Sequence, residues 1–279
     1  MTLLVSTTQL SRHLADPQWH IFDCRYDLMD TAKGERLYRE GHIPGAHLAN
    51  LDTDLAGEKS GTNGRHPLPS PAAFIGFLAR HGVAETAQIV AYDDVGGQFA
   101  ARLWWLARWV GLKNVVLLDG GINKWIAEGH ALARDVPVPR AAALRGQADP
   151  LMMVSADEVR ARLQDRAAMA LIDARAPERF RGDVEPIDKI AGHIPGAVNR
   201  FYKENLNADL TLKSAAELRA AYTALQGGAA EVVHQCGSGV TACANIFAME
   251  FAGLTGAKLY PGSWSEWIAD PARPIARGE

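Results

Sequence analysis

A six-residue motif occurs twice in this chain, at positions separated by about half its length. Residues 41–46 read Gly-His-Ile-Pro-Gly-Ala, and residues 192–197 read the same. Flanking segments recur in the same order: residues 5–10 match 154–159, residues 21–25 match 171–175, and residues 119–125 match 261–267. A period of this length far exceeds that of a solenoid repeat, so we expect two copies of one domain. The motif favours a turn, which His42 and His193 are expected to stabilise.

Both copies show the same alternation of strand and helix signals. Ser6 and Ser155 stand three residues before Gln9 and Glu158, which is the pattern of a helix-capping box. Short apolar segments predict strands at 19–23, 89–92, 115–118, 169–173, 231–235 and 257–260. Helices are predicted between them at 71–81, 98–110, 214–225 and 241–253. The alternation is typical of an α/β fold, here two tandem copies that each form a mostly parallel sheet flanked by helices.

The repeat also suggests where the domains begin and end. We expect a first domain at residues 1–132, a linker at 133–150 and a second domain at 151–279. Pro137 and Pro139 in the linker favour an extended and fairly stiff connection. The chain has 279 residues, which is enough for two domains that each bury a core.

One cysteine, Cys236, follows a predicted strand and precedes a predicted helix. The loop that it opens reads Cys-Gly-Ser-Gly-Val-Thr, and Gly237 and Gly239 allow this backbone to curl tightly. Inward N–H groups of residues 237–241 and the positive end of the helix dipole would stabilise a thiolate, which is the nucleophilic form of cysteine. We therefore expect a reactive cysteine. The alternative is a small buried residue that closes a strand.

The two copies differ at this position. When the copies are aligned, Asp93 stands where the second copy has Cys236. A carboxylate has no thiol group, so the first copy lacks at this position the nucleophile expected of Cys236. We therefore expect the first domain to be non-catalytic and to serve as a scaffold.

Composition excludes several classes of function. The net charge of −3 does not indicate a basic surface that would bind nucleic acid. The sequence contains no run of 18 apolar residues that would indicate a membrane span. The first 16 residues show no secretory signal, and three widely spaced cysteines suggest neither a disulfide framework nor a zinc site. A reducing cytoplasm is the expected compartment. Cys24 and Cys243 are expected in the core, with a resolving role for Cys243 left open.

In its repeat and its cysteine loop, the chain resembles the tandem-domain sulfurtransferases of the rhodanese and 3-mercaptopyruvate sulfurtransferase family. The resemblance covers essentially the whole chain. The loop resembles that of the mercaptopyruvate branch, because basic residues usually follow the cysteine in the thiosulfate branch. The resemblance implies two similar α/β domains with a catalytic site only in the second. It also implies that Cys236 carries sulfur as a persulfide, with no cofactor. The loop backbone of Gly237, Gly239, Val240 and Thr241 would hold the anion, and Thr241 is placed to cap the following helix.

An anionic donor needs cations near the cysteine, and residues 173–182 supply three arginines. By the resemblance, Arg179 matches the family's substrate-binding arginine. Arg175 is expected to pair with a nearby carboxylate, because Arg25 holds the same place in the first copy. Arg181 is a further candidate for contact with the substrate.

The resemblance also implies a polar trio that assists the leaving group. Ser238 matches the serine of the mercaptopyruvate branch, and His66 matches its histidine. Asp54 is the best match for its aspartate, with Asp52 as the alternative. An enolate leaving group needs such an acid, whereas sulfite does not. The alternative for His66 is an ordinary loop histidine before a proline.

The chain departs from the mercaptopyruvate branch at one point. That branch has a second arginine shortly after a Glu-Pro pair, but here residues 184–189 read Val-Glu-Pro-Ile-Asp-Lys. Arg181 and Lys189 are the candidates to replace it. The loop and the trio favour 3-mercaptopyruvate as the donor, and the missing arginine keeps thiosulfate:cyanide transfer as the alternative.

Two other classes of function remain to be weighed. A phosphatase with a cysteine loop would need an arginine six positions after the cysteine, where this chain has Ala242. A non-catalytic sulfur carrier or binding module is the other class; inactive copies lose the cysteine, as residues 89–101 did, whereas the second copy keeps it. The expected partners are thus a small anionic sulfur donor and a thiol or cyanide acceptor, with a thioredoxin-like protein as one candidate acceptor. Neither nucleic acid nor a membrane is expected.

Overall fold

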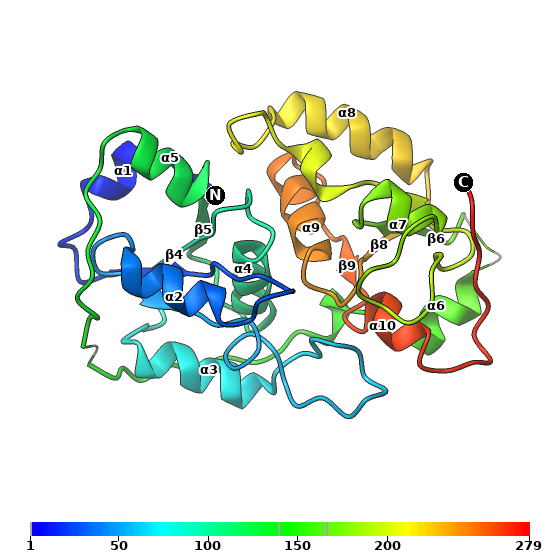
Figure 1. The fold of residues 1–279 in the computed structure, drawn as a ribbon, viewed down its shortest axis with the longest axis horizontal. Helices are drawn as coiled ribbons and strands as arrows, with labels where there is room; N and C mark the ends of the chain where they lie inside the picture. Colours follow the sequence, from blue (N-terminus) through cyan, green and yellow to red (C-terminus); the bar gives the residue numbers. More distant parts are fainter. Residues whose placement is uncertain (1, 139, 164, 166) are drawn as a thin grey trace. The chain divides into compact units, whose positions relative to one another are not determined.

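The computed structural model describes residues 2–138, 140–163, 165 and 167–279 (Figure 1). The chain divides into two compact units. The first comprises Met1–Gly57, Pro69–Asp149 and Asn207–Leu212, and the second comprises Glu58–Leu68, Pro150–Leu206 and Lys213–Glu279. Residues 58–68 lie inside the range expected for the first domain but pack as part of the second unit. Residue 139 of the expected linker lies outside the described residues.

The first unit contains a five-stranded sheet in the order β1-β5-β4-β2-β3. Its strands are β1 (Leu4–Val5), β2 (Trp19–Asp23), β3 (His47–Leu48), β4 (Gln88–Tyr92) and β5 (Val115–Leu118). All neighbouring strands are parallel, and β2 pairs with β4 in a register that places Ile21 opposite Val90. The helices are α1 (Thr7–Ser11), α2 (Lys33–Glu40), α3 (Pro71–Arg80), α4 (Ala100–Trp109) and α5 (Gly121–Ala127).

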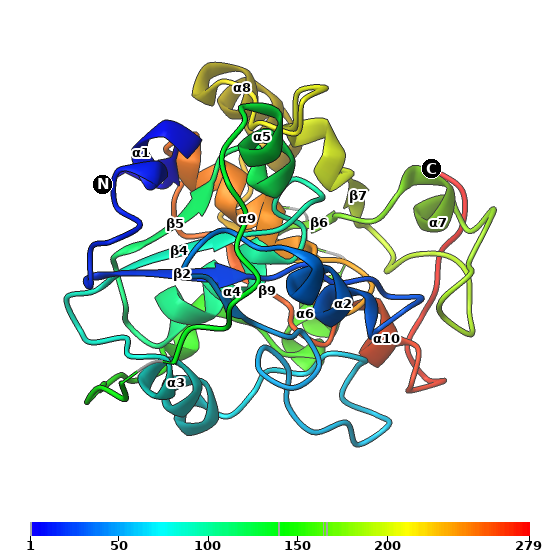
Figure 2. The same cartoon turned by 60° about the vertical axis from the view of Figure 1, so that its left-hand side comes forward.

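The second unit repeats this plan with a four-stranded parallel sheet in the order β7-β6-β8-β9; the helices of this unit are labelled in Figure 2. Its strands are β6 (Met169–Asp173), β7 (Val198–Asn199), β8 (Glu231–Gln235) and β9 (Lys258–Leu259). Its α-helices are α6 (Ala156–Arg162), α7 (Pro177–Arg181), α8 (Ala215–Gln226), α9 (Ala242–Phe251) and α10 (Ser263–Trp267). Two short 3-10 helices are η1 (Pro150–Met152) and η2 (Tyr202–Asn205). The expected fold class, an α/β protein with two parallel sheets flanked by helices, is confirmed.

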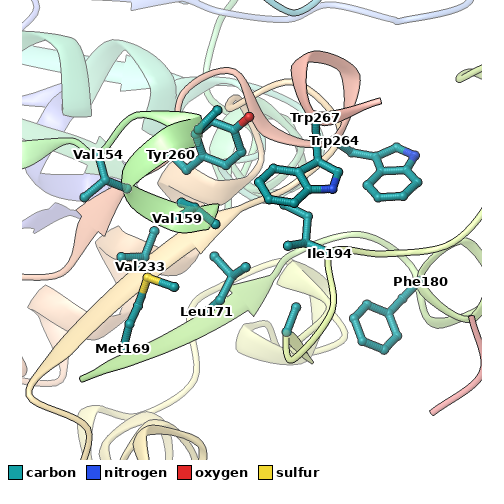
Figure 3. Close-up of a cluster of buried hydrophobic side chains, with 12 residues drawn as sticks. Val154, Val159, Met169, Leu171, Phe180, Ile194, Val233, Tyr260, Trp264 and Trp267 are labelled. Atoms are coloured by element: carbon teal, nitrogen blue, oxygen red, sulfur yellow. The ribbon is translucent and has the colours of Figure 1, made fainter. Parts of the chain in front are cut away.

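Alternation along the strands gives the sheet of the second unit two buried faces. Leu171 of β6 and Val233 of β8 point into a core that includes Trp264 and Trp267 of α10 (Figure 3). The next residue of β8, His234, lies on the opposite face, where its ring meets Tyr222 of α8 and Met249 of α9. Buried side chains therefore pack against both faces of the central strand β8, and this packing fixes the position of its carboxyl end.

The capping boxes and the turn-stabilising histidines expected from the sequence are both present in the structure. Both expected capping boxes form, at Ser6 with Gln9 and at Ser155 with Glu158. The repeated histidines stabilise their turns as expected, because Nδ1 of His42 lies 2.7 Å from the Tyr38 carbonyl oxygen and Nδ1 of His193 lies 2.8 Å from that of Phe180. Within the described part of the chain, no helix combines the length and apolar character needed to cross a membrane.

Candidate active site

Cys236 directly follows β8 and lies at the carboxyl end of a central strand. Its side chain is almost completely buried. Three residues later the chain turns through Gly239, whose φ of +73° lies in the left-handed region. A Cβ on Gly239 would stand 2.2 Å from the carbonyl oxygen of Pro261, so only glycine allows the loop to close here.

The loop is fastened to the start of α10 by three hydrogen bonds. The N–H of Cys236 donates to the Ser263 hydroxyl at 3.1 Å, and the N–H of Trp264 donates to the Cys236 carbonyl at 3.0 Å. The N–H of Ser265 donates to the Gly237 carbonyl at 2.9 Å. Ser263 adopts a φ of +53°, which is unusual for a residue with a side chain. Its hydroxyl is thereby placed against the backbone of the cysteine.

In the first unit, backbone N–H groups of the corresponding loop bind an anionic side chain, that of Asp93. The Asp93 carboxylate accepts hydrogen bonds from the N–H groups of Val95, Gly97, Phe99 and Ala100 at 2.8–3.0 Å. Both of its oxygens are used, so the first unit carries its own anion in this loop. The loop lengths also differ, since Phe99 at the N-cap of α4 stands six positions after Asp93, whereas Thr241 stands five positions after Cys236.

His66 reaches the loop from the segment Glu58–Leu68. Its Nδ1 atom lies 2.8 Å from the Ser238 hydroxyl oxygen, and both residues are buried. The segment is anchored beside them, because the N–H of Arg65 donates to the Ser265 hydroxyl at 3.0 Å. Gly64 passes so close to Gly262 that a Cβ would stand 2.8 Å from its carbonyl oxygen. The structure thus brings His66 and Ser238 together.

Asp54, the third member of the expected trio, belongs to the first unit. Its carboxylate accepts a hydrogen bond from the Asn50 N–H at 2.9 Å, and burial raises the pKa of Asp54 above its usual value. The alternative, Asp52, accepts a hydrogen bond from the Tyr26 hydroxyl. Asp54 and His66 fall in different units, so no single unit contains all three residues.

Arg175 is a structural arginine, as expected. Its guanidinium makes a two-pronged contact with Asp173, with the shortest distance 2.6 Å, and both side chains are buried. Arg25 and Asp23 make the same contact in the first unit. The pair tethers the carboxyl end of β6 to the turn motif, because Arg175 also donates to the Gly192 carbonyl at 2.8 Å.

Arg179 faces the catalytic loop together with an arginine that the sequence did not suggest, Arg65. A Cβ placed on Gly237 would stand 2.8 Å from Nη2 of Arg65 and 3.6 Å from Nη2 of Arg179. Arg179 donates to both carboxylate oxygens of Glu185 at 2.8–3.2 Å and to Asp188 at 3.1 Å. Arg65 pairs with the same Asp188. Two guanidinium groups therefore converge beside Cys236.

These carboxylates differ in how well they are stabilised. Burial raises the pKa of Glu185, but the hydrogen bonds and charge of Arg179, together with the backbone N–H groups of Asp188 and Ile187, outweigh it and leave that pKa below its usual value. Burial raises the pKa of Asp188 above its usual value, even though Arg65 and Arg179 oppose the shift. Asp188 is thus the less stable anion of the two.

The remaining candidates lie elsewhere or act differently. Arg181 donates to Asp183 at 2.8 Å and lines a cavity of about 800 Å³ that the described residues 236–241 do not line. Lys189 is exposed. Thr241 occupies the N-cap position of α9, but its side chain makes no capping hydrogen bond, so the expectation of a side-chain cap was wrong. Cys24 and Cys243 are buried core residues, as expected.

Sequence reasoning missed three polar residues of the site: Arg65, Asp188 and Ser263. Arg65 directly precedes His66, so the histidine itself was a signal that its neighbours lie near the loop. Ser263 stands where the first copy has Gly121, and this departure within the repeat was visible. Within the described ranges, no group of three or more histidine, cysteine, aspartate or glutamate side chains is arranged to hold a metal ion.

Comparisons with protein families and with known proteins all point to the same family. The model of the rhodanese-like domain matches residues 6–128 and 155–270. The chain is 45% identical, over 99% of its length and 98% of the relative's, to a Pseudomonas aeruginosa protein named "Probable 3-mercaptopyruvate sulfurtransferase". It is 38% identical, over 92% of its length and 90% of the relative's, to a Mycobacterium tuberculosis protein named "Putative thiosulfate sulfurtransferase".

A solved structure gives the same answer for the fold. The 3-mercaptopyruvate sulfurtransferase of Leishmania major superposes with a TM-score of 0.83 at 32% identity, covering 95% of this chain and 74% of that one. Two family matches in one chain, a repeated parallel α/β unit and a cysteine loop in the second copy agree with one another. This chain therefore belongs to the rhodanese-like domain family, as a tandem-domain sulfurtransferase.

Proposed function

We propose that Cys236 is the nucleophile of this sulfurtransferase and carries the transferred sulfur as a persulfide. The observation that supports this most is the position of Cys236 at the carboxyl end of β8, where Arg65 and Arg179 converge on the adjacent Gly237. The cations attract an anionic donor, and the loop backbone stabilises the charge of thiolate and persulfide. Transfer then follows two half-reactions, in which donor and acceptor react in turn.

The favoured donor is 3-mercaptopyruvate. A bond forms between the Cys236 sulfur and the donor sulfur, and the donor's carbon–sulfur bond breaks. Its electron pair stays on carbon as an enolate, which takes a proton to give pyruvate. The contact between His66 and Ser238 supports this donor, because a hydroxyl and an imidazole can stabilise and protonate the enolate. Asp54 is retained as the third member of this set.

Thiosulfate is the second candidate donor. In that case the sulfur–sulfur bond of thiosulfate breaks and its electron pair leaves with sulfite, which needs no proton. The sequence after Glu185-Pro186 keeps this alternative open, because the arginine that the mercaptopyruvate branch has there is missing.

A thiol or cyanide is the proposed acceptor. It attacks the outer sulfur of the persulfide and releases the Cys236 thiolate, giving a new persulfide or thiocyanate. A thioredoxin-like protein and a reducing cytoplasm suit this chemistry, because a working thiolate must stay reduced. We retain the domain boundaries 1–132 and 151–279, with the catalytic residues of the second domain joined by His66 from the first range.

Substitution of the cysteine tests the mechanism directly. Cys236→Ser should abolish transfer with either donor, while Cys24→Ser and Cys243→Ser should keep most of it. Mass spectrometry of the wild type after treatment with donor should find one added sulfur atom, located on Cys236. Substantial turnover by Cys236→Ser would overturn the proposal. Rates with both donors and cyanide, measured side by side, decide which donor is preferred.

A further inference from the structure

The guanidinium of Arg65 lies close to Gly237, the residue after Cys236 in the loop. Its Nη2 atom lies 2.8 Å from the point where a Cβ on Gly237 would stand. The Arg179 guanidinium approaches the same point, with its two terminal nitrogens at 3.6 and 3.8 Å. Because Gly237 is bonded to Cys236, both guanidinium groups border the place where a donor must present its sulfur.

Two carboxylates balance the charges of these arginines. Arg179 is held by Glu185 through a forked contact, and Arg65 is held by Asp188. Asp188 also contacts Arg179 at 3.1 Å, so it is the carboxylate that the two arginines share. Its side chain is only 4% exposed, and water therefore screens its charge weakly. A donor anion that binds both arginines must share them with Asp188.

We propose that Arg65 is the second donor-binding cation of this enzyme and that Asp188 competes with the donor's anionic group for Arg65 and Arg179. This inference rests on the sulfur transfer proposed above. It answers the question raised by the missing arginine after Glu185-Pro186, since the second cation comes from the segment 58–68. Lys189 is exposed and Arg181 pairs with Asp183, whereas Arg65 faces the loop.

Competition by Asp188 makes the site sensitive to the charge of the donor. Thiosulfate is a dianion, whereas 3-mercaptopyruvate carries one carboxylate charge near neutral pH. The Coulomb energy between Asp188 and a donor is proportional to the donor's charge. Asp188 therefore disfavours thiosulfate more than 3-mercaptopyruvate, and it acts as a specificity-determining residue.

Steady-state rates of three variants test this, with cyanide as the acceptor. Arg65→Gln should raise the KM of both donors by roughly 10–150-fold, the value of a charge-assisted bond to an anion. The kcat should change by less than about threefold if the contact mainly binds the donor. Arg65→Lys keeps the positive charge but loses the planar guanidinium that can donate two parallel hydrogen bonds, so it should give an intermediate KM.

Asp188→Asn should lower the KM of thiosulfate by roughly 10-fold and that of 3-mercaptopyruvate by roughly 3-fold, because the effect on free energy scales with donor charge. Asparagine keeps an oxygen that can accept from Arg65. Matched controls come from the exposed pair Arg36 and Asp30, whose nearest contact is 2.6 Å. Arg36→Gln and Asp30→Asn should leave both KM values unchanged.

A binding measurement separates this inference from the proposed function. In a Cys236→Ser background, calorimetric titration with thiosulfate should show weaker binding when Arg65→Gln is added and tighter binding when Asp188→Asn is added. This readout does not depend on turnover. Wild-type protein that transfers no sulfur would contradict the proposed function, whatever the titration gives.

Two results would overturn the inference itself. If Arg65→Gln is folded by its thermal unfolding curve and keeps the wild-type KM and thiosulfate affinity, Arg65 does not bind the donor. If Asp188→Asn raises the KM of both donors, or changes both by the same factor, Asp188 only holds Arg65 in place and does not compete.

Discussion

The Nδ1 atom of His66 lies 2.8 Å from the hydroxyl oxygen of Ser238, although 172 positions separate the two residues in the chain. Both side chains are buried, with exposed fractions of 4%. A buried imidazole and hydroxyl in contact can pass a proton and orient each other. Ser238 stands two residues after Cys236, so this contact places an imidazole and a hydroxyl beside the loop that begins at Cys236.

Removal of either partner should distinguish the two donors. His66→Ala and Ser238→Ala should each lower the kcat with 3-mercaptopyruvate by roughly 10²–10⁴-fold, the usual value of general acid help. The effect on thiosulfate should be much smaller, because sulfite leaves as a stable anion. The double variant should lose little more than either single variant, since the two residues act as a unit. Equal losses with both donors would contradict this role and favour thiosulfate.

Arg179→Ala should weaken donor binding. Arg179 is the family's substrate-binding arginine by resemblance, and its guanidinium lies within 4 Å of the Cβ position on Gly237. A charge-assisted bond to an anion is typically worth about 1.5–3 kcal/mol, so kcat/KM should fall roughly 10–150-fold with either donor. The measurement is steady-state kinetics. A variant within about threefold of the wild type would assign the donor site to other cations.

Asp93→Asn should destabilise the first unit. Its carboxylate accepts four N–H hydrogen bonds, and an amide would turn its NH₂ group toward two of those donors. We expect a loss of roughly 2–4 kcal/mol in the free energy of unfolding, measured with urea at neutral pH.

The neighbouring residue provides the control. Burial, and then the charge of Asp93, raise the pKa of Asp94 above its usual value, so its charge is unfavourable in the folded state. Asp94→Asn should therefore leave the stability unchanged or slightly higher. Equal losses for the two variants would mean that the N–H groups around Asp93 contribute little.

His234 should make the protein sensitive to acid. Burial lowers the pKa of its imidazole to about 3. An unfolded histidine has a pKa near 6.5, so below that pH the unfolded chain binds a proton that the folded chain does not. The contribution of His234 to stability is thus complete above pH about 6.5 and is lost as the pH falls toward about 3, by roughly 1.4 kcal/mol per pH unit.

Urea unfolding of His234→Leu at several pH values between 7 and 4 checks this. The variant should lose stability less steeply with falling pH than the wild type, whatever its stability at pH 7. Parallel curves for His234→Leu and the wild type would contradict the prediction.

The sequence by itself determined the features that depend on a few neighbouring residues. The repeat predicted two copies of one α/β unit, and apolar segments predicted the long strands within about a residue, as for β4 and β8. The capping boxes and the place of Cys236 at the end of β8 follow from the same local rules. Two-residue strands such as β1 and β7 escaped, because two residues are too short to show alternation.

Tertiary structure decided which distant side chains meet. The pairing of Arg65 with Asp188 spans 123 positions, and nothing in either segment alone suggests it. The segment 58–68 lies in the first half of the sequence but packs in the second unit. Local propensities act over one or two turns of chain, whereas an ion pair of this kind forms only when a whole unit has packed and excluded water from it.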